Sequence, residues 1–172
     1  MCPVANKSLL LSCLALAALL PIATLARTAD RSAPMDVAAD RTDAMLGDDS
    51  DSVLTGDVVI SQGSLQVHAD KAVIHRKAGD ITAVELTGAP ATLKQVADNG
   101  EPMVASASLI VYTLSSDLIV LTGGVVVEQP RGNLRGETIK YDLSSGRLDG
   151  GGDGNRVQMR ILPKTTAAGG TP

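Results

Sequence analysis

Short apolar runs alternate with turn-forming residues along most of this chain. Between residues 52 and 162, runs of Val, Ile, Leu and Thr are separated by Gly, Asn, Asp and Pro. β-Branched residues in short runs bounded by turn residues are typical of strands. The clearest runs are 58–60, 65–67, 72–74, 109–112, 118–121 and 125–127. Because no stretch of residues 27–172 keeps a helical apolar period over three turns, the pattern predicts an all-β protein.

Turn-forming segments lie between the runs at 76–80, 98–102 and 144–146. The Gly and Asn residues in these segments accept the positive φ that the tight turns of hairpins require. We therefore predict hairpins, in which neighbouring strands pair antiparallel.

The chain also repeats itself. The tripeptide Leu-Thr-Gly occurs at 54–56, 86–88 and 121–123, and a shift of 67 residues lays the first copy on the third without a gap. A shift of 29 residues lays Tyr-Thr-Leu-Ser-Ser at 112–116 on Tyr-Asp-Leu-Ser-Ser at 141–145. The unit is about 30 residues, or two to three strands, and it buries its apolar face only by stacking on its neighbours.

The repeats predict which side chains share a face. Strand side chains alternate with period two, so if Tyr112 points inward, Ile110 and Leu114 do too. The two shifts extend this inward set to Ile139, Tyr141, Leu143, Ala72 and Ile74. Leu109 and Val111 on the opposite face are also apolar, so either both faces are covered or the outer face meets another layer or molecule.

The start of the chain predicts an export signal at residues 1–26. Lys7 is its only charge, residues 9–20 form a Leu/Ala-rich run ended by Pro21, and residues 24–26 offer small residues where a signal peptidase reads. An uncleaved membrane anchor is the alternative, but polar residues interrupt the run and a span needs about 20 apolar residues. Lipidation at Cys13 would leave too short an apolar region. We expect a flexible N-terminus at 27–33, one domain at 34–163 and a disordered tail at 164–172.

Composition narrows the function classes. Cleavage after Ala26 would remove Cys2 and Cys13, the chain's two cysteines, and with them any thiol nucleophile, disulfide exchange motif or thiolate metal site. With no Trp or Phe, two Tyr and a net charge of −4, the chain lacks the aromatic faces and basic surface that nucleic acid needs. It has no nucleophile-elbow, phosphate-loop or zinc-protease motif, so we predict neither an enzyme nor a nucleic-acid-binding protein.

Two candidate metal sites are weak. His68 and His75 lie seven positions apart, which on an unbroken strand places them on opposite faces. The acidic segment 48–51 lacks the glycine and the final glutamate of a calcium-binding loop, and a solvated loop is the simpler interpretation. We expect no metal and no cofactor.

Short motifs follow one another in a consistent order through nearly all of the chain after residue 33. They are Leu-Thr-Gly-Asp-Val at 54–58, Gln-Gly at 62–63, Ala-Asp-Lys at 69–71, Pro-Ala-Thr-Leu at 90–93, Asp-Asn-Gly at 98–100, Ala-Ser at 107–108, Tyr112 and Leu-Thr-Gly at 121–123. Together with the export signal and the repeats, this order resembles the OstA-like (LptA) family of periplasmic lipopolysaccharide transport proteins. The resemblance implies an open antiparallel β-jellyroll, built here from repeated hairpins, with an apolar groove along its length.

The same resemblance implies a function. Family members bind lipid acyl chains in the groove, stack head to tail through terminal strands, and bridge an inner-membrane LptC subunit to the outer-membrane LptD translocon. Matching the family motifs gives Met35, Leu93, Tyr112 and Leu114 as lipid-lining positions. With the inward set, the expected lipid-binding groove is Met35, Val37, Leu65, Val67, Leu93, Ile110, Tyr112, Leu114, Ile139, Tyr141 and Leu143.

The resemblance also implies where partners attach. The N-terminal strand would accept the LptC-like subunit, and the C-terminal strand at 157–162 would meet the next copy or an LptD-like translocon. The interface residues expected are Pro34, Met35, Asp36, Val37, Ala38, Val157, Met159 and Ile161. Two alternatives remain open, namely a structural β-repeat scaffold or adhesin module without lipid, and an anchored LptC-like subunit.

Overall fold

The computed structural model describes residues 33–45, 47–96, 100–151 and 156–163. The predicted export signal, residues 27–32 and the predicted tail at 164–172 lie outside the described residues. Within the described part, no helix has the length and apolar content that crossing a bilayer requires.

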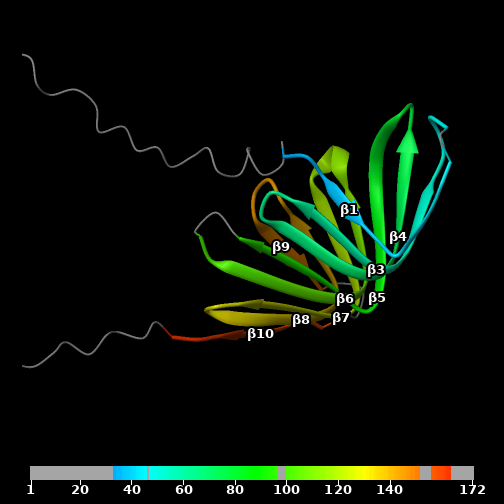
Figure 1. The fold of residues 1–172 in the computed structure, drawn as a ribbon. Helices are drawn as coiled ribbons and strands as arrows, with labels where there is room; N and C mark the ends of the chain where they lie inside the picture. The colour runs from blue at the N-terminus through cyan, green and yellow to red at the C-terminus, as the bar shows by residue number, and fades with distance from the viewer. Residues whose placement is uncertain (1–32, 46, 97–99, 152–155, 164–172) are drawn as a thin grey trace, which may run out of the picture.

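The described chain is a single antiparallel sheet (Figure 1), which confirms the predicted all-β fold class. Along the sheet, the strands follow the order β1-β3-β4-β5-β6-β7-β8-β10, with β2 also paired to β3 and β9 to β8. The elements are β1 (Asp36–Ala38), β2 (Arg41–Ala44), β3 (Ser52–Gln62), β4 (Leu65–Lys77), β5 (Asp80–Val96), β6 (Pro102–Thr113), the 3₁₀ turn η1 (Leu114–Ser116), β7 (Leu118–Gln129), β8 (Gly132–Asp142), β9 (Arg147–Gly150) and β10 (Gln158–Ile161).

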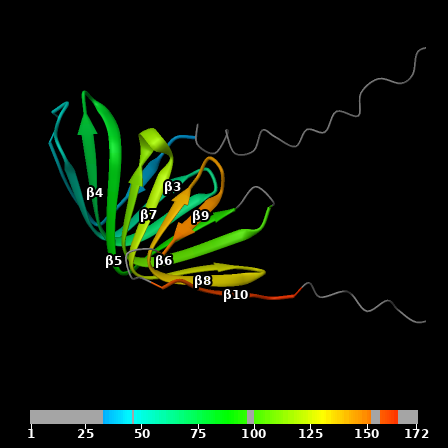
Figure 2. The same ribbon diagram turned by 180° about the vertical axis from the view of Figure 1, so that it is seen from behind.

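A line of register shifts crosses the sheet, which we call the crease. Each neighbouring pair from β3 to β8 shifts register at a corresponding place, beginning between Thr55 and Val58 in β3 and ending between Thr122 and Val125 in β7. The β4–β5 pair shifts a second time, between His75 and Arg76. β-Bulges bend strands and increase their twist. The sheet therefore folds along the crease into two arms, which the views from both sides show (Figures 1 and 2). One arm has β1 and β10 at its edges, and the other has β2 and β9.

The Leu-Thr-Gly repeat marks the crease in β3, β5 and β7. Its three leucines are buried, while Gly56 and Gly123 have φ of +79° and +86°. A Cβ on Gly88 would lie 2.7 Å from the backbone nitrogen of Ala91, so this position also requires glycine. Because the motif recurs in every second strand, the repeating unit is a two-strand hairpin.

The predicted turns are present where the structure describes them. Ala78 and Gly79 link β4 to β5 with φ of +52° and +86°, the positive pair of a type I′ hairpin turn. In the β8–β9 turn, Asp142 Oδ1 accepts hydrogen bonds from the Ser144 hydroxyl at 2.6 Å and from the Ser145 backbone N–H at 2.9 Å. The hydroxyl bond, supported by the Ser145 amide, lowers the pKa of Asp142 from 3.8 to about 2. The turn predicted at 98–102 lies partly outside the described residues, because 97–99 are not described.

The crease corrects the prediction for the two histidines. His68 and His75 both lie on the outer face, since the inward neighbours Val67 and Ile74 are both buried. The prediction of opposite faces was wrong because the alternation of β4 reverses at the register shift after His68. Strict alternation therefore holds only within one arm.

The acidic segment 48–51 is exposed, but it is also tied to the sheet. Asp49 Oδ1 accepts a hydrogen bond of 2.9 Å from the backbone N–H of Ala78 in the β4–β5 turn. Asp51 Oδ1 lies 2.9 Å from Nδ1 of His75, whose Nε2 lies 3.3 Å from Oε1 of Glu85. The segment is thus exposed, as a solvated loop would be, but it also contacts the β4–β5 hairpin.

Candidate lipid-binding site: the apolar inner face

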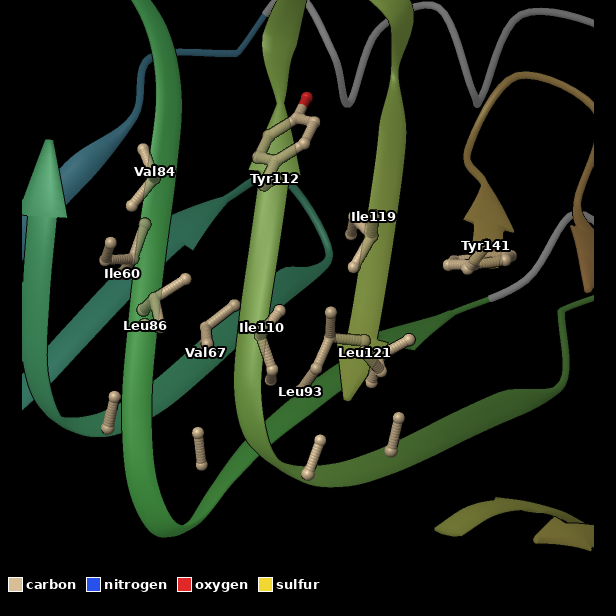
Figure 3. Close-up of a cluster of buried hydrophobic side chains, with 14 of the residues drawn as sticks. Ile60, Val67, Val84, Leu86, Leu93, Ile110, Tyr112, Ile119, Leu121 and Tyr141 are labelled. Atoms are coloured by element: carbon tan, nitrogen blue, oxygen red, sulfur yellow. The ribbon is translucent and has the colours of Figure 1, made fainter. Parts of the chain in front are cut away.

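The inner face between the two arms is a continuous apolar layer. Its side chains come from alternating positions of β3 to β8, and Ile110, Ile119 and Ile139 have no exposed surface. Figure 3 shows side chains of one arm, including Val84, Leu86 and Tyr112, facing Val67 and Leu93 of the other. The buried residues form one cluster from Leu54 in β3 to Leu143 beyond β8.

The structure places most of the predicted groove residues on this face. The buried members are Leu65, Val67, Leu93, Ile110, Tyr112, Ile139, Tyr141 and Leu143, while Met35 and Leu114 are half-buried against the cluster. Ala72 and Ile74 are buried too, so the inward set deduced from the repeats is confirmed as a set of inward side chains. Leu109 and Val111 on the outer face are half-buried, and no second layer of described residues covers them.

A narrow cleft opens within the inner face. Its free volume is about 10 Å³, about enough for one water molecule. It is lined by Met35, Ile60, Leu65, Val67, Val84, Leu86, Leu93, Ile110, Tyr112 and Ile119. At this cleft the arms therefore lie close together, and a ligand larger than water enters it only if they move apart.

Sequence reasoning missed several residues of the cleft. Ile60, Val84, Leu86 and Ile119 line it but were absent from the predicted groove. A signal for three of them was present in the repeats. Each Leu-Thr-Gly leucine points inward, and so does the residue two positions earlier in β5 and β7.

The apolar face reaches both edges of one arm. In β1, Val37 pairs with the inward Ile60, and in β10, Met159 pairs with the inward Leu134. Val37, Met159 and Ile161 are 37%, 66% and 72% exposed, so apolar side chains that continue the inner face meet solvent at each end.

The remaining predicted interface residues lie at the same edges. Pro34, Asp36 and Ala38 are exposed at the β1 edge, and Val157 is half-buried just before β10. Among the described residues, β1 pairs only with β3 and β10 only with β8, so each strand leaves one backbone edge unpaired.

A cavity of about 520 Å³ lies beside β10. Its apolar lining includes Val127, Leu134 and Met159, and its charged lining is mixed, with Arg131, Arg160, Glu101 and Asp149. Val127 and Leu134 belong to the buried cluster. The cavity is therefore the wide end of the inner face, in contrast to the narrow cleft.

Comparison with known proteins agrees with this geometry. A family model described as LptA/(LptD N-terminal domain) LPS transport protein matches residues 36–147, most of the described sheet. The chain belongs to this family. It is 31% identical over 161 residues to lipopolysaccharide export system protein LptA of Escherichia coli K12, covering 92% of this chain and 85% of that protein.

Other members of the LptA family support the assignment. The Haemophilus influenzae LptA is 32% identical over 164 residues, covering 93% of each chain. The crystal structure of LptH, the LptA-homologous periplasmic component of the lipopolysaccharide transport device of Pseudomonas aeruginosa, superposes with a TM-score of 0.71 at 26% identity. That match covers 78% of this chain and 99% of LptH. The resemblance and the open β-jellyroll predicted from the sequence are thereby confirmed.

Proposed function

We propose that this LptA-family chain is a periplasmic bridge protein that binds lipopolysaccharide and carries it from the inner to the outer membrane. The observation that carries the proposal is the apolar inner face, which runs between the two arms and continues to exposed side chains in β1 and β10. The related proteins of known function are lipopolysaccharide export proteins, which supports this ligand.

The inner face suits acyl chains chemically. Each CH₂ group removed from water contributes about 0.8 kcal/mol, so a lipid with several long chains gains strongly from an aliphatic surface. The face consists mainly of Val, Leu and Ile, with Tyr112 and Tyr141 at equivalent repeat positions. Because the narrow cleft holds only about 10 Å³, acyl chains reach this part of the inner face only when the arms separate about the crease.

The two edges of the sheet supply the attachment points. An unpaired strand edge readily adds another strand through backbone hydrogen bonds. In this proposal, β1 accepts an LptC-like inner-membrane subunit, and β10 meets either the next copy, head to tail, or an LptD-like translocon. The apolar side chains at both edges would then join successive inner faces into one path.

Substituting Asp for both Met35 and Leu114 tests lipid binding without replacing a fully buried residue. Both side chains are half-buried against the apolar cluster, so the sheet should keep its far-UV circular dichroism. A charge there opposes contact with acyl chains, and we expect binding of purified lipopolysaccharide to fall at least about tenfold. Ser115→Asp on the exposed side of η1 is the matched control and should bind normally.

A structural β-repeat module without lipid is the second candidate, because the cleft is narrow enough to be an ordinary packed core. It predicts that the wild-type chain neither co-purifies with lipopolysaccharide nor binds it when purified.

Full binding by a folded Met35→Asp/Leu114→Asp variant would instead show that the lipid does not use the inner face. N-terminal sequencing of the exported chain separates the bridge from an anchored LptC-like subunit, which would retain residues 1–26.

A further inference from the structure

We propose that an Asp36–Arg160 pair on the outer face sets the register in which β1 of one copy joins β10 of the next. The inference rests on the head-to-tail joining proposed above, and it adds which residues define the joint and why opposite edges are preferred.

The two edges of this arm carry opposite charges. At and just after β1, Asp36 and Asp40 are exposed. At and beside β10, Arg156 and Arg160 are exposed. In the part of the chain that the structure describes, neither Asp36 nor Arg160 forms an ion pair within its own copy.

The strand directions fix the geometry of the joint. Every neighbouring pair in the sheet is antiparallel, so adding β1 of a second copy to β10 continues the pattern only as an antiparallel pair. Val37 and Met159 both lie on the inner face, because they pair with Ile60 and Leu134. Their neighbours Asp36 and Arg160 therefore lie on the outer face.

One register both continues the apolar inner face across the joint and forms an ion pair on the outer face. Placing Val37 opposite Met159 continues the apolar face and puts Asp36 opposite Arg160. A slip of one residue would turn Val37 outward and bring charges to the inner face. A slip of two keeps the faces but places either Gln158 or Leu162 opposite Asp36, which loses the ion pair.

The chosen register also accounts for the exposed apolar residues beside the large cavity. Met159 and Ile161 are 66% and 72% exposed at its rim. In the joint, Val37 of the next copy contacts this rim and covers apolar surface on both copies. Joining two β1 edges would instead bring acidic residues together, and joining two β10 edges would bring arginines together, so the charges disfavour both wrong polarities.

A charge exchange tests the pair. Asp36→Arg and Arg160→Asp should each weaken self-association of the exported chain roughly tenfold at low salt, because an attraction becomes a repulsion. The double variant should recover wild-type association, measured by sedimentation velocity. Asp80→Arg, at the exposed start of β5, is the matched control and should associate normally. If the double variant self-associates as weakly as the single variants, Asp36 and Arg160 do not pair across the joint.

Disulfide trapping tests the register. Once residues 1–26 are removed the chain contains no native cysteine, so single-cysteine variants report only the designed contact. Directly opposed residues lie within disulfide reach, and diagonal residues do not. A mixture of Asp36→Cys and Arg160→Cys should form the mixed dimer under mild oxidation, whereas Asp36→Cys with Leu162→Cys should not. Efficient trapping with Leu162→Cys would overturn the register.

These outcomes are separable from failure of the proposed function. If association persists in another register while lipopolysaccharide binds normally, the bridge stands and only the charge pairing is wrong. If the wild-type chain shows no self-association at any concentration tested, the charge pairing is wrong and the head-to-tail part of the bridge fails with it. If the wild-type chain does not bind lipopolysaccharide, the proposed function itself is wrong.

Discussion

Ile110→Asp should destabilise the chain strongly, while Val111→Asp should change its stability little. Ile110 has no exposed surface and belongs to the buried cluster between the arms. An unpaired carboxylate there loses its hydration and finds no partner, which costs about 3–5 kcal/mol of a total stability that is usually about 5–15 kcal/mol. Urea unfolding followed by circular dichroism measures the loss.

Val111 is the matched control because it occupies the next position of the same strand. Its side chain is half-buried on the outer face, where Asp keeps part of its hydration. We expect Val111→Asp to lower the free energy of unfolding by about 1 kcal/mol. Equal losses for the two variants would show that the inner and outer faces do not differ as described.

Gly123→Ala should destabilise the sheet by about 3 kcal/mol, because two costs combine at the crease. Its φ of +86° disfavours any residue with a Cβ, at about 1–2 kcal/mol. A Cβ would also lie 2.8 Å from Cβ of Ser108 on the neighbouring strand β6, whose hydroxyl donates a hydrogen bond to the Gly123 carbonyl. Thermal and urea unfolding of the variant measure the sum.

Gly124→Ala separates the two costs. Gly124 also has positive φ, at +60°, but no atom lies within 4 Å of an added Cβ. This variant should therefore lose only about 1 kcal/mol. If the two alanine variants are equally stable, the close approach of β6 and β7 does not hold the crease together.

The sequence predicted the class of fold because local signals and repeats agree. β-Branched runs and hairpin turns indicated an all-β chain, and two shifts of the sequence aligned Tyr112 with Tyr141 and both with Ile74. The crease was missed because a bulge depends on the register between two strands, which single-strand alternation does not contain. As a result the runs at 65–67 and 72–74, which are parts of the single strand β4, were predicted as separate strands, and His68 and His75 were predicted to lie on opposite faces.

The candidate site could be predicted only in part, for a similar reason. Ile110, Tyr112 and Ile139 follow from alternation within one arm. The narrowness of the cleft does not follow from alternation, since it depends on how closely the two arms approach each other. The exposure of Met159 and the position of Arg160 on the outer face also required the register of β10 on β8.

In the proposed function, lipopolysaccharide contacts the inner face of the sheet. Placing a photoreactive amino acid at Tyr112 or at Val111 in cells tests this directly, because the two positions are neighbours on β6 but lie on opposite faces. We expect a lipopolysaccharide adduct from position 112 and at most about a tenth as much from position 111, with both proteins exported at equal levels. Equal adducts from both positions, or an adduct from position 111 alone, would contradict it.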